Sequence, residues 1–145
     1  MTTGHLRSVG QSDKLHCTAH VVYLLAMGSA GVVLRHVLLL QRDVPAAARF
    51  YSEGLGLVVN VCTERWAELQ AGPTRLGLKS VDSEAALSTG YSPVLSFAVP
   101  DVSAAVARCL SLGAVLDGPI KFPDGGPRVA ALRAPDGHML GLVEE

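Results

Sequence analysis

The alternation of apolar and polar positions predicts a strand, a helix and three further strands in the first half of the chain. An apolar run ends at Asp43, which can cap a helix that carries Pro45 in its first turn and is closed by Gly56. A run rich in β-branched residues follows, and the turn dipeptide Gly72-Pro73 separates two more alternating runs. The predicted elements span residues 32–41, 44–53, 57–63, 65–71 and 74–80.

The same order of elements recurs in the second half of the chain, after a polar loop. Asp101 can cap a second helix, Leu112-Gly113 ends it, and Asp136-Gly137 predicts a two-residue hairpin turn. Laying Asp43 on Asp101 superimposes the two halves, and such an internal repeat indicates two copies of one supersecondary unit. The sequence therefore predicts an α+β fold made of two βαβββ modules. Module 1 covers residues 32–81, and module 2 covers residues 93–145, with strands after its helix at 115–121, 128–134 and 138–143.

Composition excludes several classes of partner. The 145 residues, 49% of them hydrophobic, are enough for one ordinary globular domain. The 12 basic and 13 acidic residues give a net charge of −1 with no run of either sign, so nucleic acid and anionic membrane surfaces are not favoured as partners. The 3 cysteines lie far apart without CxxC spacing, which argues against a zinc knuckle or a disulfide framework.

Residues 1–31 differ from the rest of the chain. They begin weakly basic, continue into a short apolar core at residues 19–27 and end in small residues, an order that fits a targeting segment. A stable membrane span is the poorer interpretation, because small and polar residues interrupt the run near position 30. The alternative is a plain N-terminal extension in front of a single domain at residues 32–145. The compartment is therefore left open, with the cytoplasm as the default and organelle or secretory targeting as the alternative.

Four short motifs follow one another between residue 33 and the end of the chain. They are His36…Asp43, Phe50-Tyr51…Leu55-Gly56, Val99-Pro-Asp101-Val102 and Ala134-Pro-Asp136-Gly137-His138. In this order and spacing they resemble the vicinal oxygen chelate superfamily, which includes glyoxalase I, methylmalonyl-CoA epimerase, fosfomycin and bleomycin resistance proteins and extradiol dioxygenases. The resemblance implies a curled mixed sheet around a cavity between the two modules.

The resemblance also implies a place for a divalent metal. Metal-dependent members supply His, Glu, His and Glu from the first and last strands of each module. The matching positions here are His36, Gly77, Val94 and Gly141, and among them the histidine alone has a side-chain donor. The family pattern therefore predicts a degenerate metal site, with no cofactor required.

Glu68 is the residue that could compensate for the missing metal ligand at position 77. If Gly72-Pro73 is a two-residue turn, Glu68 lies directly opposite Gly77 and shares its face of the sheet. His36 and Glu68 would then hold Zn, Ni, Mn or Fe, with substrate or water completing the shell, or would act as acid and base. The alternative is a structural pair, in which His36 hydrogen-bonds Glu68 or a backbone carbonyl.

Ligand contacts are expected from other residues whose side chains are predicted to face the cavity. Trp66 lies two positions before the candidate glutamate and offers a platform for a flat ligand, with core packing as the alternative. Across the second hairpin turn the matching cavity residue is Leu132, and Arg128 shares its parity and could meet an anionic ligand. Val94, the repeat partner of the histidine, completes the ligand-binding set.

These residues favour a small-molecule-binding protein that holds its ligand in the inter-module cavity, with the metal site degenerate. The alternative is a metal-dependent lyase or isomerase like glyoxalase I, in which His36 and Glu68 hold the metal or move a proton next to a carbonyl. A scaffold without a ligand is a third interpretation, in which Trp66, Leu132 and Met139 fill the cavity. A homodimer is compatible with each, because the modules can pair within one chain or across two.

Overall fold

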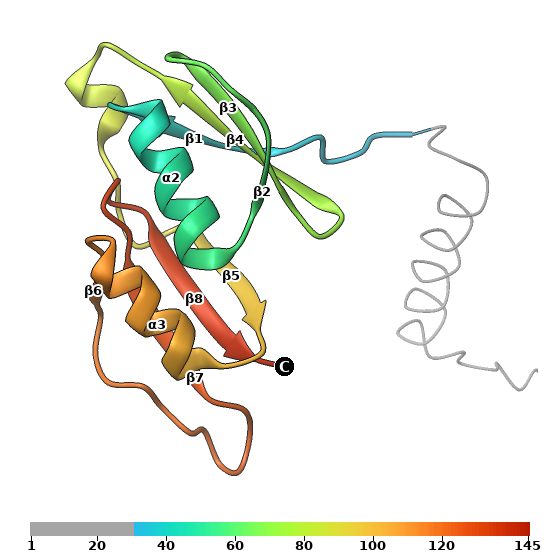
Figure 1. Cartoon of the computed structure of the whole chain (residues 1–145), viewed down its shortest axis with the longest axis vertical. Helices are drawn as coiled ribbons and strands as arrows, with labels where there is room; N and C mark the ends of the chain where they lie inside the picture. Colours follow the sequence, from blue (N-terminus) through green and yellow to red (C-terminus); the bar gives the residue numbers. More distant parts are fainter. Residues whose placement is uncertain (1–30) are drawn as a thin grey trace, which may run out of the picture. The chain divides into compact units, whose positions relative to one another are not determined.

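The computed structural model describes residues 31–145, and Arg35–Glu145 form one compact unit. The expectations for residues 1–31 lie outside the described residues, apart from the last position. Within the described part of the chain, no helix has the length and apolar character needed to cross a membrane. The elements (Figure 1) are β1 (Val37–Gln41), α2 (Val44–Leu55), β2 (Val58–Cys62), β3 (Trp66–Ala71), β4 (Thr74–Ser80), the short 3-10 helix η1 (Glu84–Leu87), β5 (Val94–Val99), α3 (Val102–Ser111), β6 (Val115–Leu116), β7 (Val129–Arg133) and β8 (Met139–Glu144).

Each module forms its own four-stranded mixed sheet. The strand order is β1-β4-β3-β2 in the first module and β5-β8-β7-β6 in the second. In each sheet the first strand pairs in parallel with the last, and the other pairs are antiparallel. These are two βαβββ modules, so the predicted α+β fold is confirmed, although the two sheets do not close into one barrel.

Both helices begin at the predicted aspartates. Asp43 and Asp101 each accept a hydrogen bond from the backbone N–H three residues later, at 3.0 Å. α2 continues to Leu55, beyond its predicted end, and its last turn packs against α3. A Cβ on Gly54 would come within 3.4 Å of Cys109 Sγ, so this glycine lets the two helices approach closely.

Each sheet packs one face against its own helix. Alternate residues of β3 and β4, such as Leu69 and Leu78, are fully buried with α2, and Leu140 of β8 is fully buried with α3. The intervening residues lie on the opposite side, which we call the open face of each sheet. The open face of the first sheet carries Leu38, Trp66, Glu68, Gln70, Gly77 and Lys79, and that of the second sheet carries Val94, Ser96, Ala131, Arg133 and Gly141.

The first hairpin turn has the predicted length. Ala71 pairs with Thr74, so Gly72 and Pro73 alone form the turn. Glu68 therefore lies opposite Gly77 on the open face, as its parity indicated.

The second hairpin turn is one residue longer than predicted, and this reverses the orientation of Leu132. A backbone hydrogen bond from Ala134 to His138 closes a loop of three residues. The register shifts by one position, so Ala131 lies opposite Gly141. Leu132 points instead to the helix side, where it is fully buried in the core. The expectation that Leu132 lines the cavity is therefore corrected.

Candidate functional site

His36 and Trp66 lie together on the side of the first sheet that carries its open face. Their ring centroids are 5.6 Å apart and their planes meet at 70°, which is an edge-to-face contact. Both rings lie beside Gly77: a Cβ there would be 2.8 Å from Trp66 Cη2 and 3.0 Å from His36 Cδ2. The indole and the imidazole therefore occupy the space that the first atoms of a side chain at position 77 would need.

Glu68 lies on the same face but has other partners. Asn60 donates a side-chain hydrogen bond to Glu68 Oε1 at 3.2 Å, and Arg75 Nη1 lies 3.8 Å from the same oxygen. His36 Nδ1 is buried without a hydrogen bond, and within residues 31–145 no hydrogen bond or ion pair joins His36 to Glu68. The expected pairing of the imidazole with the carboxylate is not formed.

The residues present do not fit a divalent metal. A hard or borderline cation needs several oxygen, nitrogen or sulfur donors to displace water. Across the described residues, no group of three or more His, Cys, Asp or Glu side chains comes together. The space beside Gly77 is bordered by Trp66, Leu38 and carbon Cδ2 of the histidine, none of which is a ligand atom.

The remaining predicted site residues lie apart from this cluster. Val94 is exposed at the start of β5 and borders a smaller cavity of about 460 Å³. Arg128 reaches to α3, where its guanidinium donates to Ser103 Oγ at 3.3 Å, and it lies 5.1 Å from the centroid of the Phe122 ring. The structure therefore brings together only the three candidates of the first sheet.

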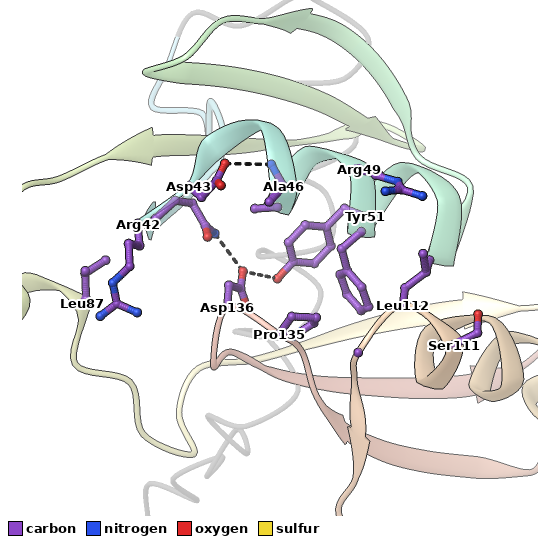
Figure 2. A pocket seen from close by; sticks show the side chains of 14 residues that line it. Arg42, Asp43, Ala46, Arg49, Tyr51, Leu87, Ser111, Leu112, Pro135 and Asp136 are labelled. Carbon is purple, nitrogen blue, oxygen red and sulfur yellow. Dashed lines mark hydrogen bonds between the residues drawn. The ribbon is translucent and has the colours of Figure 1, made fainter.

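A second candidate site is the groove between the two modules (Figure 2). It has a volume of about 770 Å³ and is bordered by the end of β1, by α2, by the end of α3 and by the second hairpin turn. Within it, Tyr51 Oη and Gln41 Nε2 each donate a hydrogen bond to Asp136 Oδ2 at 2.8 Å. The consecutive elements β1 and α2 thus meet the distant second hairpin turn at one carboxylate.

The Asp136 carboxylate is held in its charged form although its side chain is only 7% exposed. Burial alone would raise the pKa of Asp136, but the His138 imidazole, the Gln41 amide and the His138 backbone N–H hold it below its usual value of 3.8. His138 Nδ1 lies 3.2 Å from Asp136 Oδ2, although the two atoms lack hydrogen-bond geometry. Burial and the nearby Asp136 raise the pKa of Tyr51, so its hydroxyl stays protonated and keeps donating.

This network was not predicted, although Tyr51 and Asp136 belong to the motifs that carry the family resemblance. The local signal is Gln41, a polar residue that ends an apolar run and is only 2% exposed. Asp136 lies 95 positions further along the chain, and the fold alone brings the two side chains together.

Two βαβββ modules with open sheet faces, and one histidine of a metal-ligand pattern, define a protein of the glyoxalase-like class. The family model described as a glyoxalase-like domain matches residues 36–143, which is more than half of the chain. The chain therefore belongs to the glyoxalase-like domain family, within the vicinal oxygen chelate superfamily. No curated protein matches the chain at a significant level.

Solved structures share the fold over most of their length. A glyoxalase/bleomycin resistance protein/dioxygenase family enzyme from Burkholderia phytofirmans is 18% identical, with a TM-score of 0.67 over 78% of this chain and 98% of that chain. A bleomycin-binding protein from Streptomyces verticillus is 18% identical, with a TM-score of 0.56 over 80% and 98%. A fosfomycin resistance protein from Mesorhizobium loti is 18% identical, with a TM-score of 0.62 over 80% and 92%. At these identities the likeness shows the shared fold alone.

Substituting alanine for Gly77 is expected to lower the free energy of unfolding by about 1–3 kcal/mol, because the added methyl group overlaps the Trp66 indole. The matched control is Gly141→Ala at the equivalent place of the second sheet, where the new Cβ would meet its neighbours at 3.5 Å or more. Chemical denaturation followed by circular dichroism measures both variants. A Gly77 variant as stable as the Gly141 variant would show that the indole does not fill this place.

Proposed function

We propose that this chain binds a small organic molecule on the open face of its first sheet, without a metal. The observation that carries the proposal is the position of Trp66, whose indole lies beside Gly77, where metal-dependent members of the superfamily carry a glutamate. The indole is only half buried, so part of its surface is available to stack on a ligand. The site offers an aromatic surface in place of a metal ligand.

The charges around Trp66 favour a flat ligand that carries a negative group. Lys79 is paired directly with Trp66 across β3 and β4, is exposed, and forms no ion pair with any described residue. Glu68 is already engaged by Asn60 and Arg75. The ammonium group of Lys79 is therefore free to meet an anionic substituent of a ring stacked on the indole.

A protein of the same fold supports binding as the function. The bleomycin-binding protein from Streptomyces verticillus was solved as a complex with copper(II)-bleomycin. The fold can therefore host capture of an organic molecule, and the choice between capture and chemistry rests on the residues of the site.

Fluorescence of Trp66, the single tryptophan of the chain, tests this proposal. Titration with metal-free bleomycin and with the planar acid 1-naphthoate should change the emission saturably for at least one probe, and EDTA should leave the dissociation constant unchanged. Lys79→Ala should weaken naphthoate binding by about two- to fivefold, whereas the control Lys121→Ala should have no effect. Emission that responds to neither probe, or only after a divalent metal is added, would contradict the proposal.

The alternative functions have less support. A metal-dependent lyase or isomerase would use His36 and Glu68, but these side chains do not pair, and Glu68 is held by Asn60 and Arg75. Turnover of a hemithioacetal after addition of Zn or Ni, abolished by His36→Ala, would restore that alternative. The scaffold interpretation required Leu132 to help fill the cavity, but this residue lies in the core. The homodimer stays a prediction.

A further inference from the structure

The groove between the modules is separate from the open face that carries Trp66. Gln41 has the same parity on β1 as the core residue Leu39, so it faces α2, whereas Trp66 lies on the other side of the sheet. The groove volume of about 770 Å³ lies within the usual range for small-molecule sites. The proposed function leaves this cavity unused.

Gln41 presents an unused hydrogen-bond acceptor to the groove. Its side chain is polar and only 2% exposed, and it lines the groove. Because a carboxylate can only accept, the amide nitrogen must face Asp136, and the carbonyl oxygen Oε1 must point away from it. No described residue donates a hydrogen bond to Oε1. This oxygen is also not one of the side-chain atoms that are both closed off from solvent and without a hydrogen-bond partner. Gln41 Oε1 is therefore accessible to a donor that enters the groove.

The charges in the groove disfavour both anions and cations. The Asp136 carboxylate repels an anion at short range. A cation finds that carboxylate already engaged, because Oδ2 accepts from Gln41 and Tyr51 and Oδ1 accepts from the His138 N–H. The guanidinium groups of Arg42 and Arg49 flank the groove, but they are 71% and 70% exposed and already paired with Glu84 and Glu53, so they attract an anion only weakly and add no attraction for a cation (Figure 2). A neutral molecule fits these charges best.

The remaining walls suit a flat apolar body. The space is bordered by Leu112 of the second module, the Pro135 ring, Tyr51 and Phe50 (Figure 2). Apolar side chains around a few fixed polar groups are the usual composition of a small-molecule site. The ligand therefore combines a flat ring with a neutral N–H donor.

We propose that the groove is a second binding site, for a neutral, flat molecule whose N–H group donates a hydrogen bond to Gln41 Oε1. An aromatic carboxamide is the simplest member of this class. The corresponding aromatic acid has the same shape, but at neutral pH it has no donor and carries a negative charge towards Asp136.

Benzamide and benzoate are the probes that test this proposal. In ¹H–¹⁵N NMR spectra of the full chain, benzamide should shift the side-chain amide of Gln41 and the backbone amides of Leu112 and Gly113 saturably. Benzoate should bind at least about tenfold more weakly. This comparison uses the native chain and does not depend on the folding of any variant.

A pair of glutamine substitutions separates a groove contact from a general effect. Gln41→Met keeps the length of the side chain and should weaken benzamide binding at least about fivefold. Gln70→Met, on the open face, is the matched control and should leave it unchanged. Absence of a saturable shift with benzamide, equal binding of benzoate, or full binding by a folded Gln41→Met variant would each overturn the proposal. Binding at the open face is read from Trp66 fluorescence, so either site can fail while the other stands.

Discussion

Substituting alanine for Asp136 is expected to lower the free energy of unfolding by about 3–5 kcal/mol. The carboxylate accepts hydrogen bonds at 2.8 Å from Tyr51 and Gln41, whose side chains are almost fully buried. Without it, both donors remain buried and unpaired, and each costs the free energy of its desolvation. The same carboxylate joins the second hairpin turn to β1 and α2, so the loss also weakens the contact between the two modules.

Urea denaturation of the variants measures this effect. Asp82→Ala is the matched control, because Asp82 is 88% exposed and its ion pair with Arg65 has 3.7 Å between the charged atoms. The control should change stability by less than about 0.5 kcal/mol. Tyr51→Phe removes one donor and leaves the acceptor, so it should cost about 1–2 kcal/mol. An Asp136→Ala variant that is no less stable than the Asp82 variant would show that the network does not stabilise the fold.

Acid should remove the contribution of the ionised Asp136 carboxylate to the free energy of unfolding. The pKa of its carboxyl is lower in the folded chain than the usual 3.8, so the unfolded chain binds more protons as the pH falls through this range. The stabilisation from this ionisation is complete above about pH 5 and is lost as the pH falls through the folded-state pKa. The difference in unfolding free energy between the native chain and Asp136→Ala should therefore shrink as the pH falls below about 5. A difference that grows in acid would contradict this ionisation state.

Substituting alanine for Leu132 is expected to lower the free energy of unfolding by about 2–5 kcal/mol. Leu132 is fully buried in the core, so its truncation leaves a cavity there. Leu38→Ala is the matched control: this leucine is 42% exposed on the open face, and its truncation should cost less than about 1 kcal/mol. Thermal or chemical denaturation compares the two. A stable Leu132 variant with altered ligand binding would restore the interpretation of Leu132 as a cavity wall.

The fold was predictable because its signals are local. Asp43 and Asp101 mark the start of each helix with a side chain that can cap it, and the structure contains both caps. Gly72-Pro73 likewise gave the correct register for the first hairpin. The second hairpin was misread, because Asp136-Gly137 alone does not reveal that Pro135 also belongs to the loop. A single residue in a turn reverses every side chain of the following strand pairing.

The site was less predictable because it depends on contacts between distant strands. The predicted pairing of His36 with Glu68 took no account of Asn60 as a partner of the carboxylate. Asn60 lies in β2, whose pairing with β3 shifts register between Val59 and Val61. The Asn60 amide donates to both Glu68 and Gln70, at 3.2 Å each, and so competes for the carboxylate. No pattern within the strand signals such an irregularity.

The indole beside Gly77 also limits which sequences can be reached from this one by single substitutions. A glutamate at position 77 needs the space that Trp66 occupies, so Gly77→Glu alone would displace the ring. Removing the indole alone leaves His36 with no second ligand at that place. A second ligand beside His36 therefore requires a change at position 66 as well as at position 77. In evolutionary terms, a metal site on this sheet lies at least two substitutions away from the present sequence.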